Sequence, residues 1–205
     1  MPSKSVITIA MTVGSRGEEV ARDVAARLGY RYLNNEILDR AAEQAGVEAT
    51  TIAAVEHSEP LVARIMRSLA SLPMELGGYL SEELLVDETP TYRALIQSVV
   101  RSIAMEGKVV IAAHAAGISL AGTPELLRVF VTAPVETRIT RVAAEQGISA
   151  VDARKAVAHS DHERERYFER FFHLSAELPT HYDLVGNTEV LSVETFAALI
   201  IGAAA

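Results

Sequence analysis

The sequence predicts one α/β domain with a parallel central sheet flanked by helices. Short apolar runs rich in β-branched residues alternate along the chain with longer segments of helical periodicity, as βαβ units require. Two of the runs, residues 109–113 and 127–131, are continuously apolar, which is typical of parallel strands buried on both faces. The length of 205 residues fits one full-sized domain, so residues 1–205 are predicted to fold as a unit.

The chain is predicted to begin with a strand, a glycine turn and a helix. Residues 5–10 (SVITIA) form the β-branched run of the strand, and residues 14–17 (GSRG) form the turn. Apolar residues then recur at helical spacing until Gly29, a residue type that commonly ends helices. This arrangement places the glycine turn directly before a helix N-terminus.

The middle of the chain reads as mostly helical. Residues 30–33 predict a short strand, and Asn34 or Asn35 caps a helix that runs to Gly46. A helical insertion is predicted at about residues 48–90, because prolines and a glycine pair interrupt its helical pattern. Its apolar content suits either a lid over a bound ligand or a homodimer surface. A long helix is then expected from Pro90 to the vicinity of Gly107.

The last part of the chain supplies the remaining strands and a pair of lid-like helices at about residues 135–172. The predicted elements are the strands at residues 109–113 and 127–131, helices at 137–146 and from the cap Ser149 to about 172, a strand at 183–185 and a final helix capped by Ser192.

Composition limits the possible ligands and compartments. The net charge of −8 argues against a surface that neutralises nucleic-acid phosphates, but it allows a small anionic ligand held by local arginines. The first apolar run is too short for a signal peptide, and no stretch approaches the roughly 20 apolar residues that span a bilayer. The absence of cysteine fits a reducing compartment, so a cytoplasmic location away from membranes is expected.

Several segments resemble, in order and spacing, the cytidylate kinase-like family of P-loop nucleotide kinases. The segments that carry the resemblance are residues 7–10 with 14–17, 28–30 with 35–38, 109–111, 129–134, Asp161 with Arg164 and Tyr167, and 182–184 with Asn187 and Thr188. The resemblance implies a P-loop-kinase-like fold, ATP and Mg²⁺ as cofactors, and ATP-dependent phosphoryl transfer to a nucleoside monophosphate such as CMP or dCMP.

The glycine turn departs from the family pattern. Gly14, Ser15 and Gly17 are retained, Arg16 replaces a glycine, and acids occupy positions 18 and 19 where a basic residue or a hydroxyl is expected. Acids in a first helical turn are favourable by roughly 0.3–1 kcal/mol each. A carboxylate about 6 Å from a phosphate charge nevertheless costs about 3 kcal/mol at an effective dielectric near 20. The predicted nucleotide-binding residues are Gly14, Ser15, Arg16 and Gly17.

A second departure follows the strand at residues 109–113. The resemblance implies a glycine and an arginine there, the arginine approaching the substrate phosphate, but Ala113 and His114 occupy these positions. His114 has two interpretations: a partly charged phosphate contact, or a hydrogen-bonded structural residue at a strand end.

The arginines of the lid-like helices match the family pattern better. By resemblance, Arg138, Arg141 and Arg164 are expected to clamp phosphate. Arg16 is expected to stand in for the lysine that P-loop kinases carry after the glycine turn and that this sequence lacks. These four arginines are the candidate catalytic residues. The alternative is a solvated helix face with ion pairs to nearby acids, namely Glu163, Glu165 and Glu169.

A resident metal site is not predicted. His159, Asp161 and His162 lack the spacing that marks zinc hydrolases.

The sequence is compatible with two functions. The first function is a divergent nucleotide kinase that uses ATP and Mg²⁺. The second is a kinase-like protein that has lost phosphoryl transfer and binds a nucleotide, another small anion or a protein partner.

Overall fold

The computed structural model describes residues 4–34, 89–112 and 115–205, with side chains from residue 97 onward in the second of these ranges. The chain divides into two compact units, residues 1–34 with 100–205, and residues 35–99. The predicted helix that ends at Gly46, the insertion before residue 89, and Ala113 with His114 lie outside the described residues. The glycine turn and the strands that surround it belong to the first unit.

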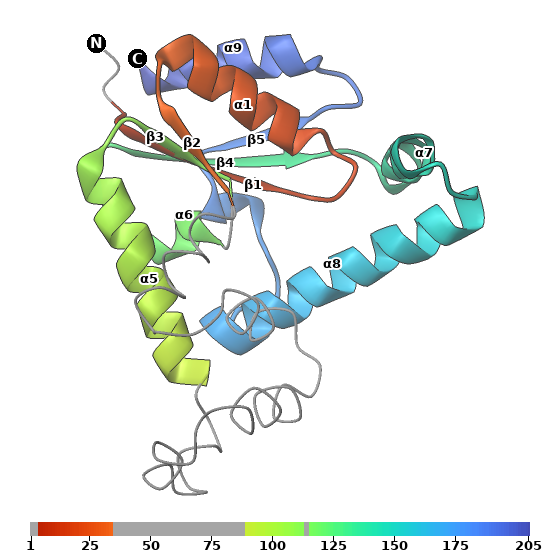
Figure 1. The fold of residues 1–205 in the computed structure, drawn as a ribbon, viewed down its shortest axis with the longest axis horizontal. Helices are drawn as coiled ribbons and strands as arrows, with labels where there is room; N and C mark the ends of the chain where they lie inside the picture. Colours follow the sequence, from red (N-terminus) through yellow and green to blue (C-terminus); the bar gives the residue numbers. More distant parts are fainter. Residues whose placement is uncertain (1–3, 35–88, 113–114) are drawn as a thin grey trace, which may run out of the picture. The chain divides into compact units, whose positions relative to one another are not determined.

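A five-stranded parallel sheet forms the centre of this unit, in the order β2-β3-β1-β4-β5 (Figure 1). The strands are β1 (Val6–Met11), β2 (Arg31–Leu33), β3 (Val109–Ile111), β4 (Leu126–Thr132) and β5 (Leu184–Asn187). All four pairings are parallel. The predicted α/β class is confirmed, and the strands lie where the apolar runs placed them.

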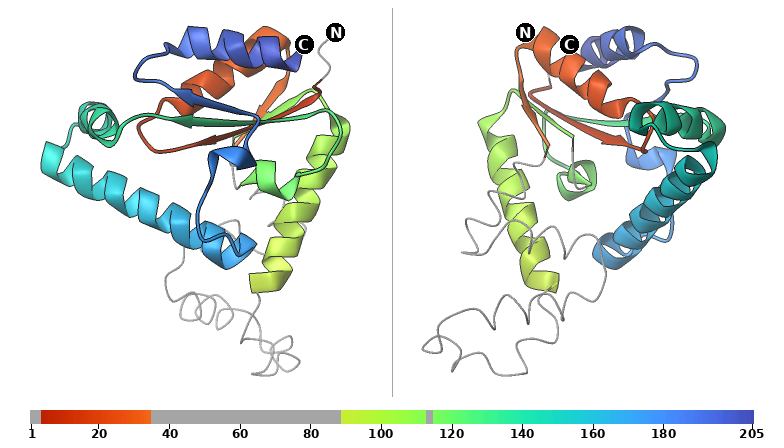
Figure 2. Two further views of the ribbon diagram at one scale, coloured as in Figure 1. Left: turned by 180° about the vertical axis from the view of Figure 1, so that it is seen from behind. Right: turned by 45° about the vertical axis from the view of Figure 1, so that its right-hand side comes forward.

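Helices cover both faces of the sheet (Figures 1 and 2). On one face α1 (Gly17–Leu28) lies beside α9 (Val193–Ala204), and on the other lies the short α6 (Ala116–Ser119). The α1 and α9 side packs one core with the strands through fully buried residues such as Val20, Val24, Phe196 and Ile200. Burial of this kind stabilises by about 1.5–3 kcal/mol per large side chain, which explains why both helices carry an apolar stripe.

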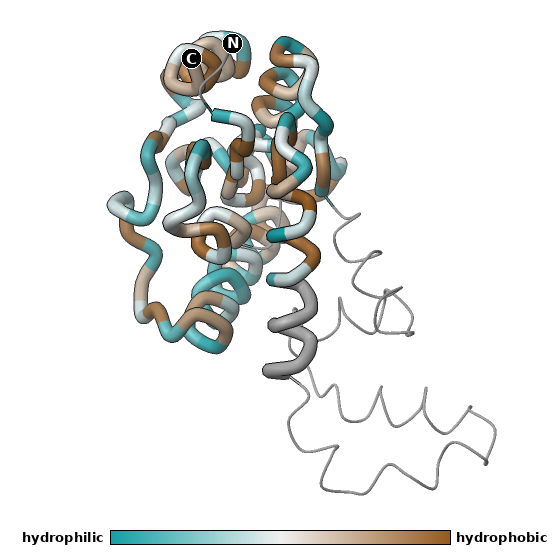
Figure 3. Tube along the Cα trace, turned by 90° about the vertical axis from the view of Figure 1, so that its left-hand side faces the viewer, coloured by the Kyte–Doolittle hydropathy of each residue, from teal (hydrophilic) through white to brown (hydrophobic). Residues whose placement is uncertain are grey.

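Three further helices complete the described chain. They are α5 (Thr89–Glu106), α7 (Val135–Gln146) and α8 (Ala150–Phe172), with a single 3₁₀ turn, η3 (Pro179–His181). The helices α7 and α8 pack on one another through a small core of their own, formed by Ile139, Val142, Ala153 and Val157. Hydrophilic residues alternate with hydrophobic ones along the helical turns (Figure 3), as expected for helices that bury one side.

The predicted helix ends are confirmed where a cap residue marked them. Gly29 ends α1 in the left-handed conformation, at φ 66°. Ser149 and Ser192 begin α8 and α9, each accepting a hydrogen bond from the backbone N–H three residues ahead. No helix among the described residues has the length and apolar content needed to cross a bilayer.

Candidate phosphate-binding turn

The turn between β1 and α1, residues 12–16 (here the β1–α1 turn), requires its glycines. Gly14 has a φ of 74°, and a Cβ at this position would lie 2.7 Å from the carbonyl oxygen of Arg138. A Cβ on Gly17 would lie 2.4 Å from the Cβ of Met11. These contacts explain why two glycines of the family pattern remain although Arg16 has replaced another.

Every main-chain carbonyl from residue 11 to residue 16 accepts a hydrogen bond. The donors, in chain order, are Arg164 (3.1 Å), Ser15 N–H (3.2 Å), Arg138 (3.4 Å), Arg141 (3.2 Å), Thr188 Oγ1 (2.7 Å) and Val20 N–H (3.1 Å). The first N–H groups of a helix have no intrahelical acceptor. The turn therefore has its acceptors engaged, and it leaves N–H donors at the start of α1.

Two polar side chains of the turn differ in their surroundings. Ser15 is fully buried, and its hydroxyl has no partner among the described residues. Leaving such a group unpaired costs about 1–3 kcal/mol, which a bound water or anion can offset. Arg16 has a φ of 59°, and its half-exposed guanidinium lies 3.7 Å from a Glu19 carboxylate oxygen. The predicted substitute for the lysine thus has a neighbouring acid.

The two acids of the first helical turn are both near arginine. Besides the Glu19 contact, Glu18 accepts a hydrogen bond from Arg22 at 2.6 Å, one turn along α1. This hydrogen bond raises the pKa of the Arg22 guanidinium. The Arg22 guanidinium also lies 4.6 Å from the ring centroid of Tyr32, whose pKa is raised mainly by burial. Local pairing reduces the repulsion that these acids would exert on a phosphate.

Arg138 is buried, with a side chain only 5% exposed. It forms two hydrogen bonds with Asp161 of α8, at 2.9 and 2.6 Å, and donates to the carbonyl of Val13. Its Nε is buried without a partner among the described residues. Arg138 thereby joins α7, α8 and the β1–α1 turn.

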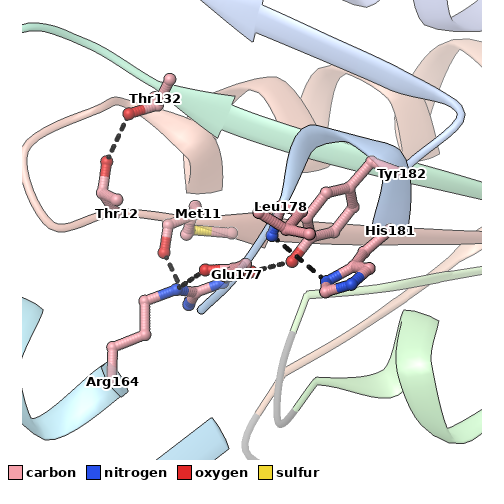
Figure 4. Close-up of polar contacts among 8 residues, drawn as sticks. All are labelled: Met11, Thr12, Thr132, Arg164, Glu177, Leu178, His181 and Tyr182. Carbon is pink, nitrogen blue, oxygen red and sulfur yellow. Dashed lines mark hydrogen bonds and ion pairs between the residues drawn. The ribbon is translucent and has the colours of Figure 1, made fainter. Parts of the chain in front are cut away.

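Arg164 forms a comparable cluster at the end of β1 (Figure 4). It donates to both carboxylate oxygens of Glu177, at 2.7 and 2.6 Å, and to the carbonyl of Met11. The hydroxyl of Tyr182 also donates to Glu177, and the Tyr182 ring stacks on Phe130. All three nitrogens of the Arg164 guanidinium thus donate a hydrogen bond within this cluster.

Arg141 reaches the other side of the turn. It donates to the carbonyl of Gly14, and it donates to both the hydroxyl and the carbonyl of Thr188, at 3.0 and 2.8 Å. All three lid arginines therefore donate to main-chain carbonyls between residues 11 and 14, at the end of β1 and in the β1–α1 turn.

The alternative expected for these arginines, ion pairs with nearby acids of their own helix face, does not describe Arg138 and Arg164. The acids expected as partners were Glu163, Glu165 and Glu169. Arg138 instead pairs with Asp161, and Arg164 pairs with Glu177, which lies beyond the end of α8. The tertiary fold brings these carboxylates to the arginines.

Thr188 and Glu177 are site residues for which the sequence predicted no role. Thr188 was part of the family resemblance but had no assigned contact, and it is buried directly after β5. Parallel strands end at one edge of the sheet, so residues that follow β1, β4 and β5 meet there. That rule is the sequence signal that would have pointed to Thr188.

The side chains of the turn fit an anion better than a magnesium–triphosphate group. Positions 18 and 19 carry acids in place of the hydroxyl that would coordinate Mg²⁺, and the only hydroxyl within residues 14–19 is that of Ser15. Among the described residues no group of three or more acidic, histidine or cysteine side chains could hold a metal ion. Of the trio His159, Asp161 and His162, Asp161 is engaged by Arg138.

Comparison with known families agrees with this geometry. The family model described as the cytidylate kinase-like family matches residues 6–190. The chain belongs to this family. The resemblance stated from the sequence is thereby confirmed, and the protein is a kinase-like P-loop protein. No curated protein matches the chain.

Solved structures with this fold include an uncharacterized protein from Eubacterium ventriosum, with 17% identity, a TM-score of 0.68 and 98% of each chain covered. Shikimate kinase from Acinetobacter baumannii, in complex with shikimate, has 12% identity and a TM-score of 0.52, with 98% of this chain and 93% of that chain covered. Shikimate kinase from Bacteroides thetaiotaomicron has 10% identity and a TM-score of 0.50, covering 97% and 94%. The cytidylate kinase-like protein therefore shares the P-loop kinase fold.

Proposed function

We propose that this cytidylate kinase-like protein binds the phosphate of a nucleotide, or a similar small anion, without transferring phosphoryl groups at the rate of a kinase. The observation that carries the proposal is the complete engagement of the carbonyls of residues 11–16 by arginine, threonine and backbone donors. A turn held in this way directs its remaining N–H groups to a ligand.

Anion binding follows from the chemistry of the turn. Backbone N–H groups at a helix N-terminus, together with the helix dipole, favour negative charge. Arg16 is in the left-handed conformation, the type of backbone position that forms anion-binding nests. The Ser15 hydroxyl, which has no partner in the described part of the chain, adds a further donor within the turn. Family membership supports a phosphorylated ligand.

Loss of rapid transfer follows from the charges. Phosphoryl transfer depends on neutralising charge with a basic residue, a metal and lid arginines. Here the lysine is replaced, Arg16 faces Glu19, and the guanidinium groups of Arg138 and Arg164 each face a carboxylate in two-point contact. Moving either arginine to a phosphate would leave Asp161 or Glu177 without its cation.

A second candidate is an active nucleotide kinase. It would use ATP and Mg²⁺ to phosphorylate a nucleoside monophosphate, CMP or dCMP first, with Arg16, Arg138, Arg141 and Arg164 rearranged around the phosphates. The presence of all three lid arginines at the end of β1 and in the β1–α1 turn favours this candidate. A role for His114 at the substrate phosphate belongs to the same proposal.

The class of ligand, the location, the domain organisation and the oligomeric state are proposals as well. The net charge of −8 favours a small anion over nucleic acid as the ligand. A cytoplasmic location, a single kinase-like domain over residues 1–205 with lid-like helices at about 135–172, and a homodimer formed through the 48–90 region stay predictions from the sequence.

The deciding experiment combines titration calorimetry with a turnover assay. Inorganic phosphate, CMP and ATP are titrated separately, the nucleotides with and without Mg²⁺, and ADP formation from ATP plus CMP is then followed. We expect measurable binding of phosphate or nucleotide and no turnover above the protein-free rate. Magnesium-dependent turnover of about 1–100 per second, typical of kinases, would establish the second candidate. If phosphate, CMP and ATP all fail to bind, both candidate functions are overturned.

A further inference from the structure

Thr188 lies at the centre of a small hydrogen-bond network on the carbonyl side of the β1–α1 turn. Its hydroxyl is 2.7 Å from the carbonyl oxygen of Ser15 and 3.0 Å from Nη1 of Arg141. The same guanidinium contacts the carbonyls of Gly14 and Thr188. The backbone N–H of Thr188 donates to Thr132 at the end of β4, which anchors the network to the sheet.

The direction of the Thr188 hydroxyl hydrogen is decided by Arg141. A guanidinium group only donates hydrogen bonds, whereas a hydroxyl has one hydrogen and two lone pairs. Because Arg141 supplies the donor of the 3.0 Å contact, Thr188 must use a lone pair there. Its hydrogen is then directed to the carbonyl of Ser15, with a weaker 3.3 Å contact to the carbonyl of Thr132.

The peptide unit between Ser15 and Arg16 links the Thr188 contact to the N–H groups on the opposite side of the turn. The carbonyl of Ser15 and the N–H of Arg16 belong to one peptide unit, which is trans. In a planar trans peptide the two groups point in opposite directions. Holding the carbonyl on Thr188 therefore directs the Arg16 N–H away from Thr188 and helps to hold Arg16 in the left-handed conformation, which is unfavourable for a residue with a side chain.

We infer that Thr188 and Arg141 are positioning residues that preset the N–H groups of the β1–α1 turn for an anion. They act through the carbonyls of Gly14 and Ser15 and need no contact with the ligand. The identity of that ligand as a phosphate rests on the proposed function. The positioning itself is a property of the free protein and can be measured without a ligand.

The test uses Thr188→Val, which keeps the shape of the side chain and removes the hydroxyl. Thr188→Ser restores the hydroxyl. Thr140→Val is the matched control, since Thr140 is exposed on α7 and its hydroxyl donates to the carbonyl of Glu136 in the same helix. In the free proteins, amide hydrogen exchange and ¹H–¹⁵N chemical shifts of residues 16–19 are recorded. We expect faster exchange and shifted signals in T188V, and wild-type behaviour in T188S and T140V.

Titration with inorganic phosphate gives the second readout. We expect T188V to weaken the phosphate affinity about tenfold, because an N–H group that Thr188 no longer orients donates poorly to the anion, and T188S to stay within about twofold. Because the two residues act as a unit, adding Arg141→Lys to T188V should weaken binding little further. If T188V fails to fold, R141K alone replaces it, since the single ammonium nitrogen of lysine cannot occupy the positions of both Nη1 and Nη2 of Arg141.

The outcomes separate the two proposals. If wild-type protein binds neither phosphate nor nucleotide but T188V still alters exchange at residues 16–19, the proposed function fails and the positioning role stands. If exchange and shifts at residues 16–19 are unchanged in T188V, the positioning role is overturned even if phosphate binds. Unchanged phosphate affinity in T188V, alongside tight binding by the wild type, would also overturn it.

Discussion

The guanidinium of Arg138 forms two hydrogen bonds with the carboxylate of Asp161, at 2.9 and 2.6 Å, while its side chain is only 5% exposed. One of the same nitrogens reaches the carbonyl of Val13. The pair thus links the second lid-like helix to the β1–α1 turn through a buried cation.

Replacing Asp161 by asparagine should destabilise the fold, because the change leaves the Arg138 charge buried without its counter-ion. We expect a loss of about 2–4 kcal/mol in the free energy of unfolding, measured by urea denaturation at pH 7. Glu136→Gln is the matched control, since Glu136 pairs with Arg154 in the same two-point manner but on the surface. Equal effects of the two changes would contradict the structural role of the buried pair.

Gly17→Ala should also destabilise the fold, although alanine is the better helix former. The added Cβ would meet Met11 at 2.4 Å, so β1 or α1 has to shift, at a cost of about 1–3 kcal/mol. Gly202→Ala in α9 is the control, because no atom lies within 4 Å of its Cβ position. Thermal unfolding should show G17A below and G202A at or above the wild type. A G17A protein as stable as G202A would refute the close packing.

Glu18→Lys should strengthen phosphate binding. The change removes a negative charge from the first turn of α1 and adds a positive one near the expected anion. We expect about a tenfold gain in affinity for inorganic phosphate at low salt, shrinking as ionic strength rises. Glu125→Lys makes the same change in net charge at an exposed residue beside the start of β1, at the other end of that strand from the turn, and should leave affinity nearly unchanged. Similar gains in both variants would mean that net charge, and not the turn, controls binding.

Asp183 should contribute stability that depends on pH. Hydrogen bonds from the Arg128 side chain lower the pKa of the Asp183 carboxyl. A lowered folded-state pKa means that the stabilisation is complete above the ordinary aspartate pKa of about 3.9 and is lost as the pH falls towards the folded-state pKa. The stability difference between wild type and Asp183→Asn should therefore be larger at pH 7 than at pH 2.5. A difference that does not vary with pH would exclude this linkage.

Much of the architecture is encoded in local sequence. Apolar and β-branched runs located the three inner strands β1, β3 and β4 of the sheet, because inner parallel strands are buried and therefore rich in apolar residues. Gly29, Ser149 and Ser192 marked helix ends, because backbone caps need particular residue types at single positions. The glycine turn, followed by a helix and these strands in order, also sufficed to place the chain in its family.

The partners of the arginines could not be predicted in this way. Arg138 and Asp161 are 23 residues apart in the sequence, and Thr188 and Ser15 are 173 apart. Contacts over such separations have no counterpart in the local periodicity of the sequence. The strands, the capped helices and the residues of the turn can be deduced from the chain alone, since they depend on burial and backbone conformation. The engagement of the turn's carbonyls by the lid arginines emerges only in the folded protein, because the parallel sheet brings distant strand ends to one edge.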